Sequence, residues 1–116
     1  MEVVVVGGGK LGKALCEDLA QEGHEIVLID KDEEIVNNFM EDLDIRGVIG
    51  NGSARIVQEE ANVPDCNFFI AVTPSDETNL IAATIASKIG ADFSIARVRS
   101  PEYAHDLPFF QEELKI

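Results

Sequence analysis

The turn Gly7–Gly12, with glycine at positions 7, 8, 9 and 12, constrains the fold of this chain more than any other feature. It directly follows the apolar run Val3–Val6, which lacks polar alternation and is therefore typical of a strand covered on both faces. It also opens the segment Lys10–Glu22, whose apolar residues recur at helical spacing until Gly23 stops the pattern. A buried strand, a glycine turn and an amphipathic helix in direct succession predict the first strand–helix unit of a parallel sheet.

The rest of the chain continues the alternation of apolar runs and helical patterns. Further strands are predicted at Ile26–Ile29, Val48–Ile49, Phe68–Val72 and Ser94–Val98, and further helices at Asp32–Leu43, after Ser53, at Asp76–Ile89 and within Leu107–Ile116. We expect Ser53 to cap the third helix, Gly90 to end the fourth and Pro101 to end the last strand. Short connections in such an alternation force parallel pairing with right-handed crossovers. The predicted fold is a Rossmann-like, doubly wound α/β domain with strand order 3-2-1-4-5.

Length and composition limit the classes of protein. A chain of 116 residues suffices for one domain, and we expect residues 1–116 to be a single domain of a longer chain, because a full six-stranded sheet needs one more strand. No apolar run is long enough to span a membrane and no secretory signal is visible, so we expect a cytoplasmic protein without direct membrane insertion. The net charge of −13 disfavours binding to nucleic acid. Cys16 and Cys66 are expected to be reduced core residues rather than a disulfide or a metal site.

The glycine turn predicts a phosphate-binding site at the start of the first helix. Glycines at positions 7, 9 and 12 match the pattern G-x-G-x-x-G in the strand–turn–helix context that its mechanism requires. Gly7 permits the tight turn, Gly9 lets a pyrophosphate approach the backbone, and Gly12 lets the helix pack close to the strand. The unpaired N–H groups of the first helical turn, which includes Lys10 and Leu11, then face the phosphates.

Asp30 supplies the second half of the pattern, because it ends the second strand, where a carboxylate can accept hydrogen bonds from an adenosine ribose. The same charge repels a ribose 2′-phosphate, which favours NAD or an adenine nucleotide over NADP. Lys31 could soften this preference, although we expect its side chain to face solvent. The alternative interpretation is a set of turn glycines and a capping Asp in an α/β protein that binds no nucleotide.

Other candidate ligand residues follow the third, fourth and fifth strands, at the edge where open α/β sheets bind ligands. They are Asn51 with its neighbours Gly52 and Ser53, then Thr73, Ser75 and Asp76, and finally Arg97 and Arg99. Asn51 could pair with an adenine edge or be a plain turn residue. The residues after the fourth strand could reach a far phosphate or a second ribose, or could cap the helix and face solvent. Both arginines could bind phosphate oxygens, although we expect an ordinary surface ion pair for at least one of them.

Several segments resemble a known family. They are VVVVGGGKLGKALCEDL, IVLIDKD, GNGSARIVQEEANV, AVTPSDETNLIAATIA and ARVRSPEY, and the resemblance covers essentially all of the chain. The chain resembles the TrkA-N domain of Trk-type potassium-uptake regulators, which is also called KTN or RCK, for regulator of potassium conductance. The last three segments are far more specific than the glycine turn.

The resemblance implies a domain on the cytoplasmic face of a potassium channel or transporter, in dimers that assemble into rings. Such domains bind NAD(H), ATP, ADP or a related adenine nucleotide such as AMP, and the bound ligand alters the ring and so gates ion flow. Family members usually continue into a smaller C-terminal ligand-binding domain, so the resemblance also implies that this chain is a fragment.

The resemblance also implies roles for individual residues. The family's glycine turn, its ribose-binding acid and its adenine-side polar residue fall on Gly7, Gly9, Gly12, Asp30 and Asn51. Lys10 occupies a position where many relatives carry a basic residue that faces the phosphates, which implies a role in reading the end phosphate of a nucleotide triphosphate. Arg99 lies in the Arg-x-Arg stretch near the ligand mouth of such domains.

Catalysis within this chain is not expected. The acid–base candidates are His24 at the amino end of the sheet, and Tyr103 and His105 in the tail, and no nucleophile–base or metal-ligand spacing occurs. The enzyme alternative is the cofactor-binding domain of an NAD-dependent dehydrogenase whose catalytic domain is missing. A third interpretation is a structural scaffold with an empty cleft.

The fourth predicted helix indicates self-association. Its segment Leu80–Ala86 is apolar almost all round, whereas a helix that covers one face of a sheet needs a single apolar stripe. The tail adds Leu107, Phe109, Phe110 and Leu114, which a domain of this size can hardly bury alone. We expect a two-fold dimer built on these helices.

Overall fold

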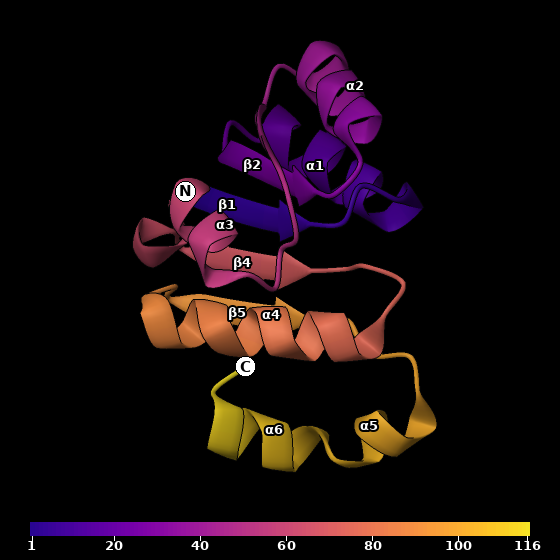
Figure 1. The fold of residues 1–116 in the computed structure, drawn as a ribbon, viewed down its shortest axis with the longest axis vertical. Coiled ribbons are helices and arrows are strands. Elements are labelled where there is room, and N and C mark those ends of the chain that lie inside the picture. Colours follow the sequence, from indigo (N-terminus) through magenta and orange to yellow (C-terminus); the bar gives the residue numbers. More distant parts are fainter.

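The computed structural model describes residues 1–116 as a five-stranded parallel sheet in the order β3-β2-β1-β4-β5 (Figure 1). The strands are β1 (Glu2–Val6), β2 (Glu25–Asp30), β3 (Arg46–Ile49), β4 (Phe68–Ala71) and β5 (Phe93–Ala96). The helices are α1 (Lys10–Gln21), α2 (Glu33–Leu43), α3 (Arg55–Glu60), the 3-10 turn η1 (Val63–Asp65), α4 (Asp76–Ile89), α5 (Pro101–His105) and α6 (Leu107–Leu114). The predicted doubly wound fold and its strand order are confirmed.

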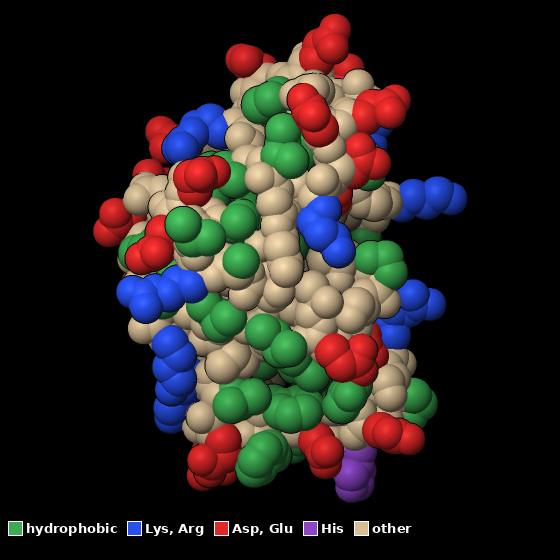
Figure 2. Space-filling view, in the orientation of Figure 1, with side chains coloured by type: hydrophobic (Ala, Val, Ile, Leu, Met, Phe, Trp, Pro, Cys, Tyr) green, Lys and Arg blue, Asp and Glu red, His purple; other side chains and the backbone are tan.

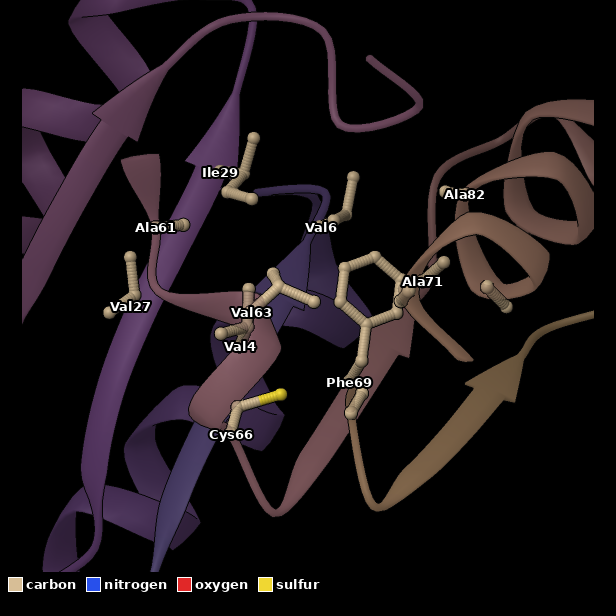
Figure 3. Packing of buried hydrophobic residues seen from close by; sticks show 13 residues of the cluster. Val4, Val6, Val27, Ile29, Ala61, Val63, Cys66, Phe69, Ala71 and Ala82 are labelled. Atoms are coloured by element: carbon tan, nitrogen blue, oxygen red, sulfur yellow. The ribbon is translucent and has the colours of Figure 1, made fainter. Parts of the chain in front are cut away.

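Alternate residues of the central strand β1 supply the two halves of the core. Val3 and Val5 pack with Cys16 of α1 and with α2 on one face of the sheet. Val4 and Val6 point to the opposite face, where Phe69 of β4 lies among them beneath η1 and α4 (Figure 3). Both faces of the sheet centre are thus covered, which explains why β1 carries no polar residue between positions 3 and 6.

The two cysteines belong to this core. Cys16 and Cys66 are free thiols and both are buried. Burial raises the pKa of Cys16 to about 12 and that of Cys66 to about 11. Since only the thiolate is strongly nucleophilic, both side chains act as apolar packing groups, as the sequence predicts.

The helix ends differ in how their first N–H groups are satisfied. Asp32 caps α2 by accepting hydrogen bonds from the N–H groups of Glu34 and Ile35, and Ser75 caps α4 by accepting one from Thr78. Helix α1 has Gly9 as its N-cap residue, so it lacks a side-chain cap, and it has no acidic residue in its first turn. Its free N–H groups are therefore available to a ligand.

Three local predictions are wrong. Strand β5 spans Phe93–Ala96 rather than Ser94–Val98. The N–H of Arg97 makes the last backbone hydrogen bond to β4, and the carbonyl oxygen of Arg97 accepts a hydrogen bond from a side chain of α4 instead of continuing the strand. Ser53 does not cap α3, whose N-cap residue is Ala54, because the Ser53 hydroxyl donates to Asn51 instead. Pro101 does not end the strand, which stops at Ala96; it is the first residue of α5, where its fixed φ suits a helix start.

No helix of the structure combines the length and the apolar character that a membrane span requires.

Gly12 is expected to be essential for stability. A Cβ at Gly12 would overlap the carbonyl oxygen of Gly7, which is backbone and cannot rotate away. We expect Gly12→Ala to lower the free energy of unfolding by about 3 kcal/mol or more, measured by urea denaturation. Gly9→Ser is the matched control, because nothing lies within 4 Å of a Cβ there and serine is a good N-cap residue. Equal stability of the two variants would contradict this packing argument.

Candidate functional site

A cleft of about 700 Å³ lies at the carboxyl ends of the strands. Its sides come from the glycine turn after β1, the end of β2, the loop after β3, and the segments that follow β4 and β5. Most of the candidate residues line it: Gly7, Gly9, Lys10, Leu11, Asp30, Lys31, Asn51, Gly52, Thr73, Ser75, Arg97 and Arg99. Gly12, Ser53 and Asp76 do not line it, and each has a structural role beside it.

The glycine turn leaves a space beside the backbone at the start of α1. Gly7 has a φ of +112°, a conformation that side-chain-bearing residues rarely adopt, and a Cβ there would come within 3.1 Å of the backbone of Val72 and Thr73. Gly9 has an ordinary φ of −78° and nothing within 4 Å of the place of its missing Cβ. Gly7 and Gly12 therefore serve the fold, whereas the space at Gly9 is open to a ligand.

Asp30 is joined directly to the glycine turn. Its Oδ2 accepts a hydrogen bond of 2.8 Å from the N–H of Gly8, and its Oδ1 accepts one of 2.9 Å from the N–H of Asp32. These bonds hold the carboxylate at the edge of the cleft, and each oxygen retains a lone pair for a ligand hydroxyl. Gly8 was not among the predicted site residues. A Cβ at Gly8 would overlap Ile35, so this position requires glycine. The sequence feature that could have identified Gly8 is the unbroken run of three glycines.

The loop after β3 is held in shape by side chains. Asn51 Oδ1 accepts hydrogen bonds from the N–H of Ser53 (3.0 Å) and from its hydroxyl (2.8 Å), so Asn51 is a turn residue whose Nδ2 amide has no partner within the protein. Gln58 of α3 is fully buried, and its Nε2 donates to the carbonyl oxygens of Gly52 (2.8 Å) and Ala82 (3.0 Å). Gln58 was not predicted, although a polar residue on the buried side of a short helix is a usable signal.

The first turn of α4 organises the opposite side of the cleft. Ser75 caps the helix, as the alternative interpretation of this residue proposed. Asp76 accepts hydrogen bonds from the N–H groups of Arg99 (3.0 Å) and Ser100 (2.7 Å), and these bonds hold the pKa of its carboxyl group below its usual range. Asp76 therefore fixes the segment after β5 and does not line the cleft.

The cleft gathers positive charge in a strongly acidic protein. Asp30 supplies the one carboxylate that lines it. Four cationic side chains line it as well, those of Lys10, Lys31, Arg97 and Arg99. None of the four takes part in an ion pair, because the two salt bridges of the chain join His24 to Glu22 and Arg55 to Glu59. The expected surface ion pair of Arg97 or Arg99 is therefore wrong, since Asp76 binds backbone N–H groups instead of a guanidinium. Free cations around a cleft favour an anionic ligand.

A family model for the TrkA-N domain matches residues 3–109. The chain belongs to the TrkA-N domain family. This TrkA-N domain is 35% identical over 103 residues to a Trk system potassium uptake protein TrkA homolog of Methanothermobacter thermautotrophicus, a match that covers 89% of the chain and 48% of the relative. It is 36% identical over 114 residues to the Trk system potassium uptake protein TrkA of Halomonas elongata, which covers 97% of the chain and 25% of the relative. The chain thus spans about half the length of the first relative and a quarter of the second.

Solved structures share the fold at low sequence identity. The TrkA-N domain of inner membrane protein ybaL from Escherichia coli superposes with a TM-score of 0.83 at 21% identity, over 96% of this chain and 80% of that one. The GsuK channel bound to NAD gives a TM-score of 0.80 at 17% identity, over 94% of this chain and 20% of that one. The Kef C-terminal domain of Shewanella denitrificans in its AMP-bound form gives 0.71 at 17% identity, over 82% of this chain and 57% of that one.

The acid–base candidates lie outside the cleft. His24 lines a separate groove at the amino ends of the strands, where its Nδ1 lies 3.2 Å from the amino group of Met1. His105 is exposed on α5, and Tyr103 lies on the same helix near Glu77 of α4. The ionisable groups in the cleft are therefore the four cations and Asp30.

Asp76 is expected to make the stability of the TrkA-N domain depend on pH. Because its folded-state pKa lies below the unfolded value, the carboxylate stabilises the fold above the ordinary aspartate pKa, and this contribution is lost as pH falls through the folded-state value. We expect Asp76→Asn to lower the melting temperature at pH 7 and to differ less from the wild type as the pH approaches 3. Asp42→Asn, at an exposed position on α2, is the charge-matched control. A constant difference between wild type and Asp76→Asn across this range would contradict the assignment.

Proposed function

We propose that this TrkA-N domain is a regulatory domain that binds NAD(H) or an adenine nucleotide and thereby controls a membrane potassium transporter or channel. The observation that carries the proposal is the uncapped start of α1 beside the open space at Gly9, with the Asp30 carboxylate hydrogen-bonded to the same turn. This arrangement offers N–H donors for a diphosphate next to an acceptor for a ribose.

The cleft suggests how such a ligand lies. Its diphosphate would bind the N–H groups at the start of α1 and Lys10, and its adenosine ribose would bind Asp30. The adenine would lie toward Asn51, whose Nδ2 amide has no partner within the protein. The far phosphate or second ribose would reach Thr73 and the arginines after β5. The solved GsuK channel bound to NAD and the AMP-bound Kef domain, which share this fold, support a nucleotide as the class of ligand.

The charges in the cleft refine this proposal. Four cations and one carboxylate favour ligands that carry several negative charges, whereas the position of Asp30 disfavours a phosphate on the ribose 2′-oxygen. Lys31 lines the cleft but is exposed, so it offsets only part of this repulsion. We therefore propose NAD(H), ATP, ADP or AMP rather than NADP as the ligand.

Two alternatives make different predictions. The cofactor domain of a dehydrogenase should prefer the complete dinucleotide, whereas a regulator should bind ADP or AMP about as well as NAD. A scaffold with an empty cleft should show no rise in melting temperature with any nucleotide. The dehydrogenase alternative places its catalytic residues in a missing domain, so the comparison of ADP and NAD affinity, rather than the lining of this cleft, separates it from the regulator.

The membrane partner is proposed from the relatives, which are named Trk system potassium uptake proteins. The domain would lie on the cytoplasmic side and contact the transporter without inserting into the membrane. A ligand can shift such a partner only by its difference in affinity for the two states, typically about 1–3 kcal/mol.

Gly9→Asp tests the site without disturbing the fold. The position has an ordinary φ and free space, and aspartate is a favoured N-cap residue, so the variant should be at least as stable as the wild type. Its carboxylate would occupy the place of the diphosphate. We expect the affinity for NAD, ADP and ATP to fall at least about 100-fold, measured by isothermal titration calorimetry.

Gly9→Asn is the matched control, because it has the same size and capping preference but no charge. It should weaken binding by a smaller factor than Gly9→Asp. Undiminished binding of NAD and ATP to folded Gly9→Asp would place the nucleotide site elsewhere.

We also propose a two-fold homodimer, which could be a unit of a larger ring. Ile81 on α4 is 53% exposed and Phe109 on α6 is 60% exposed. Figure 2 shows hydrophobic side chains gathered over the part of the surface where α4, α5 and α6 lie. A contiguous apolar patch of this kind is typical of a protein interface.

Ile81→Glu is expected to abolish this dimer. It places a charge in the centre of the proposed contact at a position that is already exposed, so the monomer should remain folded. Sedimentation equilibrium at high micromolar concentration should show a dimer for the wild type and a monomer for the variant. Ile56→Glu on α3, at a position 75% exposed and outside this patch, should remain dimeric. A monomeric wild type would refute the dimer.

A further inference from the structure

One buried amide joins the two segments that form the far side of the cleft. Asn79, in the first turns of α4, has no exposed surface. Its Oδ1 accepts hydrogen bonds from the N–H of Thr73 (2.9 Å) and from the Thr73 hydroxyl (2.7 Å). Its Nδ2 donates to the carbonyl oxygens of Thr73 (3.0 Å) and Arg97 (3.0 Å). The two segments follow different strands, β4 and β5, and this side chain bonds to both.

The amide can adopt one orientation only. Two donors face two carbonyl oxygens, and the acceptor faces two donors, so a flipped amide would set like groups against each other. Oδ1 accepts two hydrogen bonds and Nδ2 donates two, so all donors and acceptors of the side chain are used. Neither a shorter nor an apolar residue could replace these bonds without leaving buried polar groups unpaired.

The backbone of Arg97 is consequently held from two sides. Its N–H donates to Ala71 of β4 at 2.9 Å, while its carbonyl oxygen accepts from Asn79. The side chain that starts from this fixed point is half-buried, lines the cleft and forms no ion pair. A guanidinium whose base is fixed and which forms no ion pair is suited to bind an anion at a defined place.

We propose that Asn79 is a positioning residue for the ligand. By holding Thr73 and the carbonyl group of Arg97, it sets where the Arg97 guanidinium meets a phosphate of the bound nucleotide. This inference rests on the proposed nucleotide-binding function.

A double-mutant cycle separates positioning from a general structural role. ADP affinity is measured by calorimetry for the wild type, Arg97→Gln, Asn79→Asp and the double variant. Asn79→Asp has the same shape and still accepts from Thr73, but it replaces the Nδ2 donor by an oxygen that faces the carbonyl groups of both Thr73 and Arg97. We expect Arg97→Gln to weaken ADP binding about tenfold in the wild type and less than about twofold in the Asn79→Asp background. Lys10→Gln, on the opposite side of the cleft, should cost the same factor in both backgrounds.

The outcomes distinguish this inference from the function on which it rests. A full tenfold effect of Arg97→Gln in both backgrounds, or no effect in either, would overturn the positioning role while leaving nucleotide binding intact. A wild type that binds neither ADP nor NAD would overturn both. Circular dichroism and thermal unfolding establish that each variant is folded. If Asn79→Asp does not fold, the smaller and uncharged Asn79→Ser takes its place in the same cycle, with the same expected factors.

Discussion

The close approach of α1 to the end of β1 is the constraint on which the site depends. Gly12 lies against the carbonyl oxygen of Gly7, so closely that no side chain fits between helix and strand. This contact directs the uncapped start of α1 at the cleft, and the bond from Gly8 to Asp30 places the carboxylate beside it. The N–H groups proposed to bind a diphosphate and the carboxylate proposed to bind a ribose are therefore fixed relative to each other by backbone geometry. A side chain at Gly12 or at Gly8 would move these groups apart.

The distribution of charge follows from the same geometry. A protein with a net charge of −13 can hold an anion only where local groups outweigh the overall field. Helices α2 and α4 carry Asp32 and Ser75 as caps and acidic residues in their first turns, which satisfies their N–H groups and dipoles internally. Helix α1 has neither, and four unpaired cations line the cleft beside it. Among the three longest helices, α1 alone therefore starts without a side-chain cap and without an acidic first turn.

The local features of the sequence predicted most of the fold and the core of the site. Strand and helix periods, the glycine turn and the acid after β2 depend on neighbours within one strand–helix unit. Apart from the bounds of β5, they lie where they were predicted. The errors at Ser53 and Pro101 have local causes, whereas the others depend on contacts between distant segments. Strand β5 ends early because Asn79, eighteen residues before Arg97, binds the Arg97 carbonyl group, and Asp76 turned out to bind backbone far along the chain. Gln58 was missed for the same reason, since its acceptors lie on the loop after β3 and on α4.

These distant contacts share one element, α4, and this has a consequence for regulation. Asn79 bonds to the two segments on the far side of the cleft, and the carbonyl oxygen of Ala82 accepts a hydrogen bond from Gln58, which also holds the loop proposed to contact adenine. Ile81 lies between these two positions along the helix but points outward, onto the surface proposed for the dimer. A helix moves as a rigid unit. A ligand that draws one of these connected segments inward would therefore displace the side chains on the outer face of α4. Coupling between the proposed nucleotide site and the proposed partner subunit would then need no long pathway, because both would contact α4.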